Sequence, residues 1–179
     1  MSSPNVILTG FMGTGKTTVG RLLAKRLGYA FVDTDALIED RSGQKVVDIF
    51  RQKGEAAFRR MEGAIACELA QKDGLVVSTG GRMMLAAENA AVLGRCGRVF
   101  CLVADPEEIL SRVSRDEQVR RPLLEAADPL ARIVELMQER AEQYGRFRQL
   151  VTTGKTPEAV AETLLALLRV DPDFENWLR

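Results

Sequence analysis

The sequence contains no histidine, and this absence removes several kinds of active site. A general base, a nucleophile relay or a zinc site built on imidazole is excluded. Cysteine is scarce as well: the chain has 3, at Cys67, Cys96 and Cys101, with no C-x-x-C spacing. An odd number of cysteines without a metal-binding pattern predicts buried, reduced thiols rather than a disulfide framework.

An excess of charge of one sign is also missing, because 25 Lys and Arg balance 25 Asp and Glu. That balance gives no electrostatic footprint for nucleic acid or for an anionic membrane surface. No apolar run approaches the length of a membrane span, and the first residues, "MSSPNVILTG", do not have the pattern of a signal peptide. We therefore expect a cytoplasmic protein, a monomer that binds neither nucleic acid nor membrane.

The apolar segments that are present alternate between strand and helix patterns. Short runs typical of buried strands occur at residues 5–9, 29–35, 75–78, 98–104 and 149–153. Helical patterns separate them, which predicts an α/β fold: a parallel sheet with helices on both faces. We take residues 1–179 as a single domain. A charge-dense segment, residues 114–127, is a candidate mobile lid, and residues 171–179 have no assigned role.

The first strand pattern leads into a phosphate-binding motif. "GFMGTGKT", residues 10–17, fits G-x-x-x-x-G-K-[ST], and an amphipathic helical pattern follows, as the motif requires. Glycines let backbone N–H groups curl around a phosphate, and the helix N-terminus adds its positive dipole end. A plain glycine-rich turn is the alternative, but the lysine and threonine favour nucleotide binding. The residues predicted to contact ATP here are Gly13, Thr14, Gly15, Lys16, Thr17 and Thr18.

Other features favour a small phosphotransferase among the proteins with this motif. The Asn-Lys-x-Asp signature of guanine recognition is absent. The strand pattern at residues 98–104 is followed by Asp105 and Pro106, which a capped helix start explains better than the acidic strand end of an ATPase motor.

A second group of polar residues is suited to the acceptor of a phosphoryl group. Asp33 and Asp35 stand two apart at a strand end, so strand alternation puts both on one side. Near Mg·ATP, one could hold the metal and the other could accept a hydroxyl proton; alternatively, Asp35 only caps the next helix. Arg59 and Arg140 lie in helical patterns, where arginines are usually just solvated. Arg121, in the candidate lid, could neutralise charge on the transferring group.

Together these motifs resemble the shikimate kinase family over roughly residues 5–170. The matching pieces are "GFMGTGKTTVGRLLAKRLG", "FVDTDALIEDRSG", "IFRQKGEAAFRRME", "STGG", "RRPLL" and "RAEQY", in the family's order and spacing. The resemblance implies a three-layer P-loop kinase fold, with a five-stranded parallel sheet in strand order 2-3-1-4-5. It also implies ATP-dependent phosphorylation of the 3-hydroxyl of shikimate, in the route to aromatic amino acids.

On the nucleotide side, the resemblance implies a role for five residues of this chain. Lys16 and Thr17 hold the phosphates and the Mg²⁺ cofactor, with Asp33 behind the metal. Arg121 lies over the phosphates. Lys155 belongs to "TTGKTP", a segment that corresponds loosely to the family's adenine-contacting loop.

On the acceptor side, the resemblance implies that Asp35 binds the reacting hydroxyl and is the best candidate for a base. Arg59 and Arg140 clamp the carboxylate of the substrate. Gly80 and Gly81 line the ring of the substrate through their backbone, where a side chain would collide with it.

One position departs from the family, which usually has a third glycine where this chain has Arg82. We expect Arg82 to have a negative φ and to direct its guanidinium away from the acceptor, toward solvent or a nearby carboxylate. The alternative is that Arg82 enters the acceptor site and selects another hydroxy acid. A third hypothesis, a nucleotide-binding regulator without catalysis, is opposed by the presence of Lys16, Asp35 and Arg121.

Overall fold

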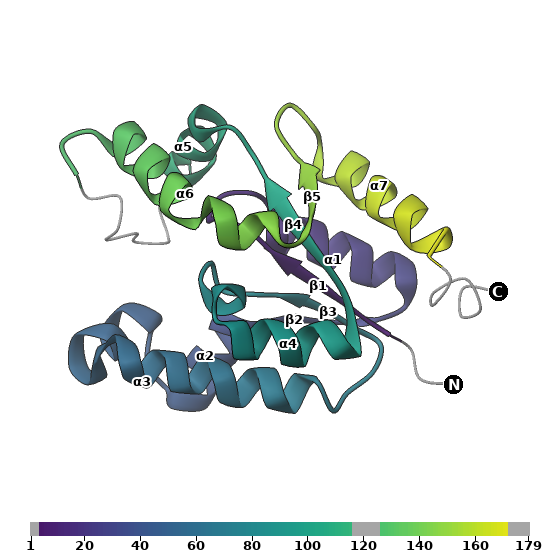
Figure 1. The fold of residues 1–179 in the computed structure, drawn as a ribbon, viewed down its shortest axis with the longest axis horizontal. Coiled ribbons are helices and arrows are strands. Elements are labelled where there is room, and N and C mark those ends of the chain that lie inside the picture. Colours follow the sequence, from purple (N-terminus) through teal and green to yellow (C-terminus); the bar gives the residue numbers. More distant parts are fainter. Residues whose placement is uncertain (1–3, 116–125, 172–179) are drawn as a thin grey trace.

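Five parallel strands form the centre of the computed structural model, which describes residues 4–115 and 126–171. The strands are β1 (Asn5–Thr9), β2 (Ala30–Asp33), β3 (Leu75–Ser78), β4 (Gly97–Val103) and β5 (Arg148–Val151). Neighbouring strands pair in parallel, in the order β2-β3-β1-β4-β5 (Figure 1). The predicted α/β fold and the strand order implied by the resemblance are both confirmed.

Helices fill the connections between strands, close to where the sequence predicts them. They are α1 (Lys16–Leu27), α2 (Thr34–Ser42), α3 (Val46–Leu69), the 3₁₀ helix η1 (Met83–Leu85), α4 (Ala87–Cys96), α5 (Pro106–Ser114), α6 (Pro129–Gly145) and α7 (Pro157–Arg169). Within α3, Gly54 has φ 79° and ψ 167°, so the helix is kinked there. Glycine adopts this conformation without steric cost.

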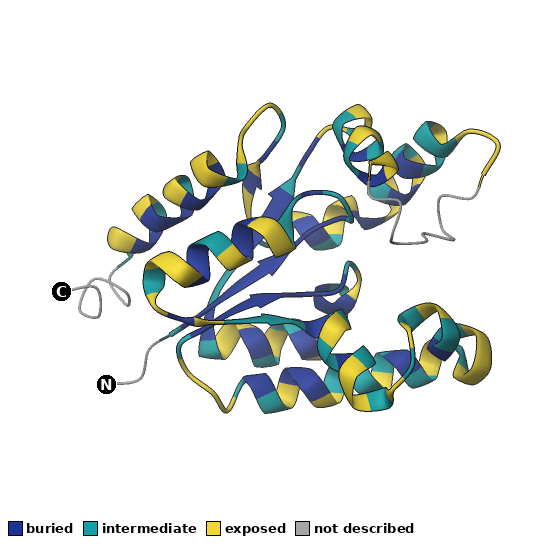
Figure 2. Cartoon of the chain, turned by 180° about the vertical axis from the view of Figure 1, so that it is seen from behind, coloured by how far each residue is buried: buried dark blue, intermediate teal, exposed yellow. Residues whose placement is uncertain are grey.

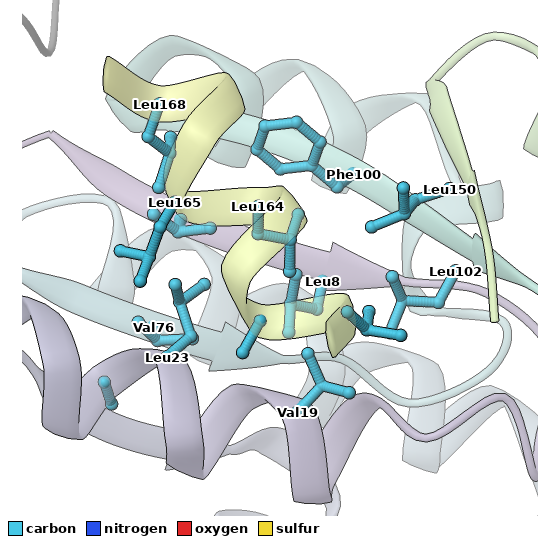
Figure 3. Packing of buried hydrophobic residues seen from close by; sticks show 14 of the residues in the cluster. Leu8, Val19, Leu23, Val76, Phe100, Leu102, Leu150, Leu164, Leu165 and Leu168 are labelled. Carbon is cyan, nitrogen blue, oxygen red and sulfur yellow. The ribbon is translucent and has the colours of Figure 1, made fainter. Parts of the chain in front are cut away.

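The central strand is buried on both faces, as expected for a parallel sheet covered by helices. Val6 and Leu8 face the apolar cluster under α1 and α7 (Figure 3), whereas Ile7 belongs to the cluster under α2, α3 and α4. A third cluster packs α5 and α6 near the end of β4. Figure 2 shows the buried residues on the sheet and along the inward sides of the helices.

Capping side chains start several helices. The Asp128 carboxylate accepts a hydrogen bond from Ala131 N at the start of α6, and Thr156 caps α7 in the same way. Asp105 stands at the predicted N-cap position before Pro106, but its side chain makes no capping hydrogen bond, so that part of the prediction is wrong. Its backbone N–H instead donates to Thr153 Oγ1, at 2.8 Å.

Two further expectations change with the structure. Cys101 is buried and Cys96 half-buried, but Cys67 is exposed on α3, so the prediction of three buried thiols is wrong for Cys67. Most of the candidate lid (residues 116–125, including Arg121) and residues 172–179 lie outside the described residues. Among the helices of residues 4–115 and 126–171, none has the length and apolarity needed to cross a membrane.

The connections around β1 create the place for a ligand. The chain leaves β1 toward α1 on one face of the sheet, whereas it leaves β3 toward η1 and α4 on the other face (Figure 1). Ligands of open parallel sheets bind outside the carboxyl ends of the strands at such a divergence. The predicted phosphate-binding loop and Lys16, the aspartates Asp33 and Asp35, and the glycines Gly80 and Gly81 lie at or just after the ends of β1, β2 and β3, at this edge.

Candidate active site

The loop between β1 and α1 has the backbone of a phosphate cradle. A Cβ at Gly10 would lie 2.2 Å from Leu102 O, so no other residue fits between the loop and β4. Gly15, the N-cap of α1, has φ 96° and ψ 11°, a left-handed conformation that glycine adopts readily. The helix therefore begins at Lys16 with its free N–H groups and positive dipole end facing the loop.

Lys16 lies over this loop and bonds to it. Its Nζ donates to Gly10 O at 2.9 Å and to Phe11 O at 2.8 Å. Burial lowers the pKa of Lys16 from 10.5 to about 8, and the nearby carboxylates of Asp35 and Asp33 oppose this shift. The ammonium is therefore partly desolvated and close to both candidate carboxylates, where its charge acts strongly on an anionic ligand.

Thr17 and Asp33 are brought together as predicted. Thr17 Oγ1 donates to Asp33 Oδ2 at 2.9 Å and lies 3.4 Å from Ser78 Oγ. The other carboxylate oxygen of Asp33 accepts from the backbone N–H groups of Asp35 and Ala36, at 3.2 and 3.3 Å. Asp33 is thus the N-cap of α2, and the alternative that Asp35 caps this helix is wrong.

Asp35 points into a buried space beside Gly80 and Glu62. A Cβ on Gly80 would lie 2.5 Å from Asp35 Oδ1 and 3.1 Å from Glu62 Oε1, so both carboxylates converge on this glycine. Neither of these two oxygens has a hydrogen-bond partner among the described residues. Such buried acceptors are costly unless something else satisfies them, which marks the space as a candidate ligand site.

The electrostatics of this space follow from its burial. Burial raises the pKa of Asp35 from 3.8 to about 6, the carboxylates of Asp33 and Glu62 add to the shift, and Lys16 and Arg59 oppose it. Burial also raises the pKa of Glu62, against the hydrogen bond from Arg59. A carboxylate with a pKa near neutrality that is still ionised at pH 7 is suited to accept a proton.

Arg59 is not a freely solvated arginine. Its Nη1 donates to Glu62 Oε2 at 2.6 Å, and its Nε and Nη2 both donate to Glu55 Oε1 at 3.1 Å. Its guanidinium carbon lies 5.8 and 5.4 Å from the ring centroids of Phe50 and Phe58. Glu62, whose side chain is only 1% exposed, therefore fixes Arg59 beside the space that Asp35 faces.

Arg140 approaches the same region from α6. The residue is 6% exposed, and its guanidinium carbon lies 5.2 Å from the centroid of the Phe11 ring. Its Nη1 is 4.0 Å from the position that a Cβ on Gly81 would take. One turn later, the Tyr144 hydroxyl donates to Gly81 O. Burial raises the pKa of Tyr144 to about 12, so the hydroxyl keeps its proton and remains a donor.

The two glycines differ in what surrounds them. Gly80 is buried, and its N–H donates to Thr34 Oγ1 at 2.9 Å. At Gly81, the nearest atom to an added Cβ is Gly10 O, at 3.9 Å, so the protein itself leaves room for a side chain there. A side chain at Gly80 would collide with Asp35. At Gly81, by contrast, the free space faces Arg140 and is open to a ligand.

The expected conformation of Arg82 is confirmed. Arg82 has φ −112° and ψ −5°, an ordinary conformation for a residue with a side chain, so an arginine at this position does not strain the backbone. Its Nη1 contacts Glu55 Oε1 at 3.1 Å, and both side chains are 50% exposed. Arg82 therefore turns to a nearby carboxylate, as predicted.

A hollow of about 480 Å³ lies on the other side of the phosphate cradle. Of the predicted ATP-binding residues, Gly13, Thr14, Gly15, Thr18 and Lys155 line it. Arg112, which the sequence did not single out, crosses it: Arg112 donates to Gly13 O at 3.3 Å and to Thr152 O at 3.0 Å. A larger hollow of about 660 Å³, lined by residues such as Cys67 and Arg95, contains none of the predicted site residues.

The described residues thus place a phosphate cradle, a base candidate and two arginines around one edge of the sheet. Known proteins resemble this chain over most of its length. The family model "Shikimate kinase" matches residues 12–169. A shikimate kinase from Gloeobacter violaceus is 47% identical over 164 residues, which is 92% of each chain, and one from Synechococcus sp. is 41% identical over 169 residues, 94% of this chain and 84% of the relative.

A solved structure supports the same assignment. The shikimate kinase from Acinetobacter baumannii in complex with shikimate superposes with a TM-score of 0.86, at 36% identity and over 93% of each chain. The family model covers most of the chain, the relatives exceed 40% identity over nearly its whole length, and the folds agree. This chain belongs to the shikimate kinase family.

Proposed function

We propose that this protein transfers the terminal phosphoryl group of ATP to the 3-hydroxyl of shikimate. One observation carries the assignment of the acceptor site: the paired glycines Gly80 and Gly81 stand between the unpaired Asp35 oxygen and the Arg140 guanidinium. A ring that carries both a hydroxyl and a carboxylate would present one to Asp35 and the other to the arginines.

Lys16, Thr17 and Asp33 hold the phosphate end of ATP in this proposal. The Thr17 hydroxyl and an Asp33 carboxylate oxygen are the hard oxygen ligands that Mg²⁺ prefers, and their 2.9 Å contact places them together beside the cradle. They would hold Mg²⁺, which neutralises phosphate charge when it is bound. Lys16 would exchange its two carbonyl contacts for phosphate oxygens and act on the negative charge of the transferring group.

Asp35 serves as the base. Its pKa of about 6 leaves it mostly ionised at pH 7, yet basic enough to take the hydroxyl proton as the oxygen attacks phosphorus. The position of Gly80 below the carboxylate fixes how closely the hydroxyl can approach. Positioning of this kind contributes most of the acceleration in phosphoryl transfer, because little covalent chemistry is left to the protein.

Arg59 and Arg140 recognise the carboxylate of the acceptor. They come from α3 and α6, on different sides of the glycine pair, and both are held by aromatic rings and by protein contacts. Arginine suits this role because its planar donors match a carboxylate in two parallel hydrogen bonds. Arg82, which raised the possibility of another acceptor, is engaged by Glu55 instead.

The remaining roles rest on the sequence. Arg121, outside the described residues, would lie over the phosphates, and Lys155 and Thr18 would border the nucleoside in the hollow that they line. A monomeric state, a cytoplasmic location and a single domain over residues 1–179 stay predictions.

The decisive experiment is a coupled assay of ADP release with shikimate, gluconate, nucleoside monophosphates or no acceptor. We expect turnover with shikimate to exceed every other condition by at least about 100-fold, because the carboxylate clamp and the base act on it together. Shikimate whose carboxylate is replaced by an amide should lose this advantage. Equal rates with shikimate and with no acceptor would overturn the proposal, and Lys16→Ala serves as the background control.

A further inference from the structure

One carboxylate, Glu55, is shared between two arginines of the acceptor region. Glu55 Oε1 accepts hydrogen bonds from Arg59 Nε and Nη2 and from Arg82 Nη1, all at 3.1 Å. Glu55 follows directly after the kink of α3 at Gly54, whereas Arg82 follows the glycine pair and precedes η1. The contact therefore links two segments that both border the acceptor site.

The donors of Arg59 explain why this contact matters. A guanidinium has five N–H donors, and three of those of Arg59 point to the protein's own carboxylates, Glu55 and Glu62. Within the part of the chain that the structure describes, two donors are left for the carboxylate of a substrate. Any change in the hold of Glu55 on Arg59 therefore changes the direction in which those two donors point.

The charge of Glu55 is the second consideration. The negative charge of Glu55, which bonds to Arg59, also repels the substrate carboxylate that Arg59 has to bind. Water screens the repulsion between such charges near a protein surface only in part. Arg82 supplies a positive charge on the same oxygen of Glu55. It offsets the repulsion and gives the Glu55 side chain a second anchor besides Arg59.

We infer that Arg82 is a positioning residue for the acceptor carboxylate, which acts through Glu55 on Arg59. This inference rests on the proposed function and deepens it, because it gives a role to the residue that stands where the family usually has glycine. Arg82 requires no contact with the substrate for this role. Its φ of −112° means that the backbone accommodates the arginine without cost.

The test is a double-mutant cycle of the full-length chain: wild type, Arg82→Gly, Glu55→Gln and the double variant. The KM values of shikimate and ATP, kcat, and calorimetric binding of shikimate are measured for each. Arg82→Gly should raise the KM of shikimate about two- to fivefold, the size expected for an exposed ion pair, with kcat and the KM of ATP unchanged. In the Glu55→Gln background, the same substitution should change the KM by less than about 1.5-fold, because no charge remains to offset.

Two further measurements separate positioning from a merely structural contact. Arg82→Lys should keep the wild-type KM, because the contact to Glu55 uses a single nitrogen. The difference between wild type and Arg82→Gly should shrink as salt is raised, because both side chains are half exposed. The matched control is Arg41→Ala, which removes an ion pair between α2 and α3, Arg41 with Glu68, and should leave the KM of shikimate unchanged.

The outcomes are distinct. A wild-type protein that phosphorylates shikimate, with an unchanged KM in Arg82→Gly, overturns the inference and leaves the proposed function standing. A rise in KM of equal size in both Glu55 backgrounds also overturns it, because Arg82 would then act on the substrate directly. A wild-type protein without activity on shikimate overturns both.

Discussion

Replacing Gly80 by alanine should damage catalysis with little damage to the fold. Gly80 does not have a positive φ, so alanine is compatible with the backbone. Its Cβ, however, would lie 2.5 Å from Asp35 Oδ1, where an ordinary contact begins at 3.4 Å, so the carboxylate must retreat by about 0.9 Å. A displacement of about 1 Å at a reacting group costs on the order of 100-fold in rate, equivalent to about 2.7 kcal/mol.

The assay compares Gly80→Ala with two other glycine variants. Gly81→Ala meets no protein atom closer than 3.9 Å, so it should fold normally and keep Asp35 in place, but raise the KM of shikimate at least about tenfold if the ring lies against it. Gly94→Ala, in α4 with no atom within 4 Å, should leave the kinetics unchanged and stabilise the protein by about 0.5–1 kcal/mol.

The interpretation of this experiment requires both kcat and the melting temperature of each variant. Gly80→Ala should melt within a few degrees of the wild type, keep its KM for ATP, and lose about 100-fold in kcat. A folded Gly80→Ala protein with the kcat of the wild type would show that the Asp35 carboxylate does not act from its observed position. Loss of kcat in Gly94→Ala as well would mean that the effect is not local.

Three other outcomes follow from the site. The kcat of the wild type should decline as the pH falls below about 6, because Asp35, whose pKa is raised to about 6, is then protonated and cannot act as the base. Asp35→Asn should lose about 10²–10⁴-fold in kcat, and its pH–rate profile should lack this decline at acid pH. Lys16→Ala should abolish turnover yet melt near the wild-type temperature, since the partners of Lys16 Nζ among the described residues are two loop carbonyls; near-normal turnover would refute the phosphate cradle. Arg59→Ala and Arg140→Ala should each raise the KM of shikimate far more than that of ATP; equal effects on both substrates would contradict the clamp. Both should also lower the melting temperature, Arg140→Ala because the position is buried, and Arg59→Ala because it leaves the buried Glu62 carboxylate without this partner.

The sequence predicts much of the fold because local signals and burial agree in it. The run "NVILT" is apolar on both faces, which only a central strand between two helical layers satisfies. The phosphate cradle is equally predictable, because the glycines and Lys16 are consecutive in the chain. The start of α2 is harder to predict. The strand pattern of residues 29–35 extends through Asp35, whereas in the structure the helix begins at Thr34 and Asp33 caps it.

Residues whose role depends on distant partners were missed. Glu62 looks like a solvated helical residue in "RRMEG", but it is buried in the structure, where its carboxylate lies beside Gly80, a residue distant in the sequence. Its spacing of three from Arg59 was the available signal, since such residues are neighbours on a helix. Tyr144 follows Arg140 by four residues and shares its face for the same reason. Arg112 has this kind of spacing only toward Glu108, four residues before it, whereas its partners at the site lie in the phosphate cradle and after β5, far away in the sequence.

The strand order has a consequence for the protein during its synthesis. Of the five described strands β1 leaves the ribosome first, but it is the central strand, and its neighbours β3 and β4 are made much later. A nascent chain that ends before α6 already contains the phosphate cradle, Asp35 and Arg59, yet it lacks Arg140 and the strand that covers the outer edge of β4. Such non-local pairing is slow to form, and an uncovered strand edge invites association with other chains. The complete carboxylate clamp is therefore acquired only when α6 has been made, long after the elements that hold phosphate.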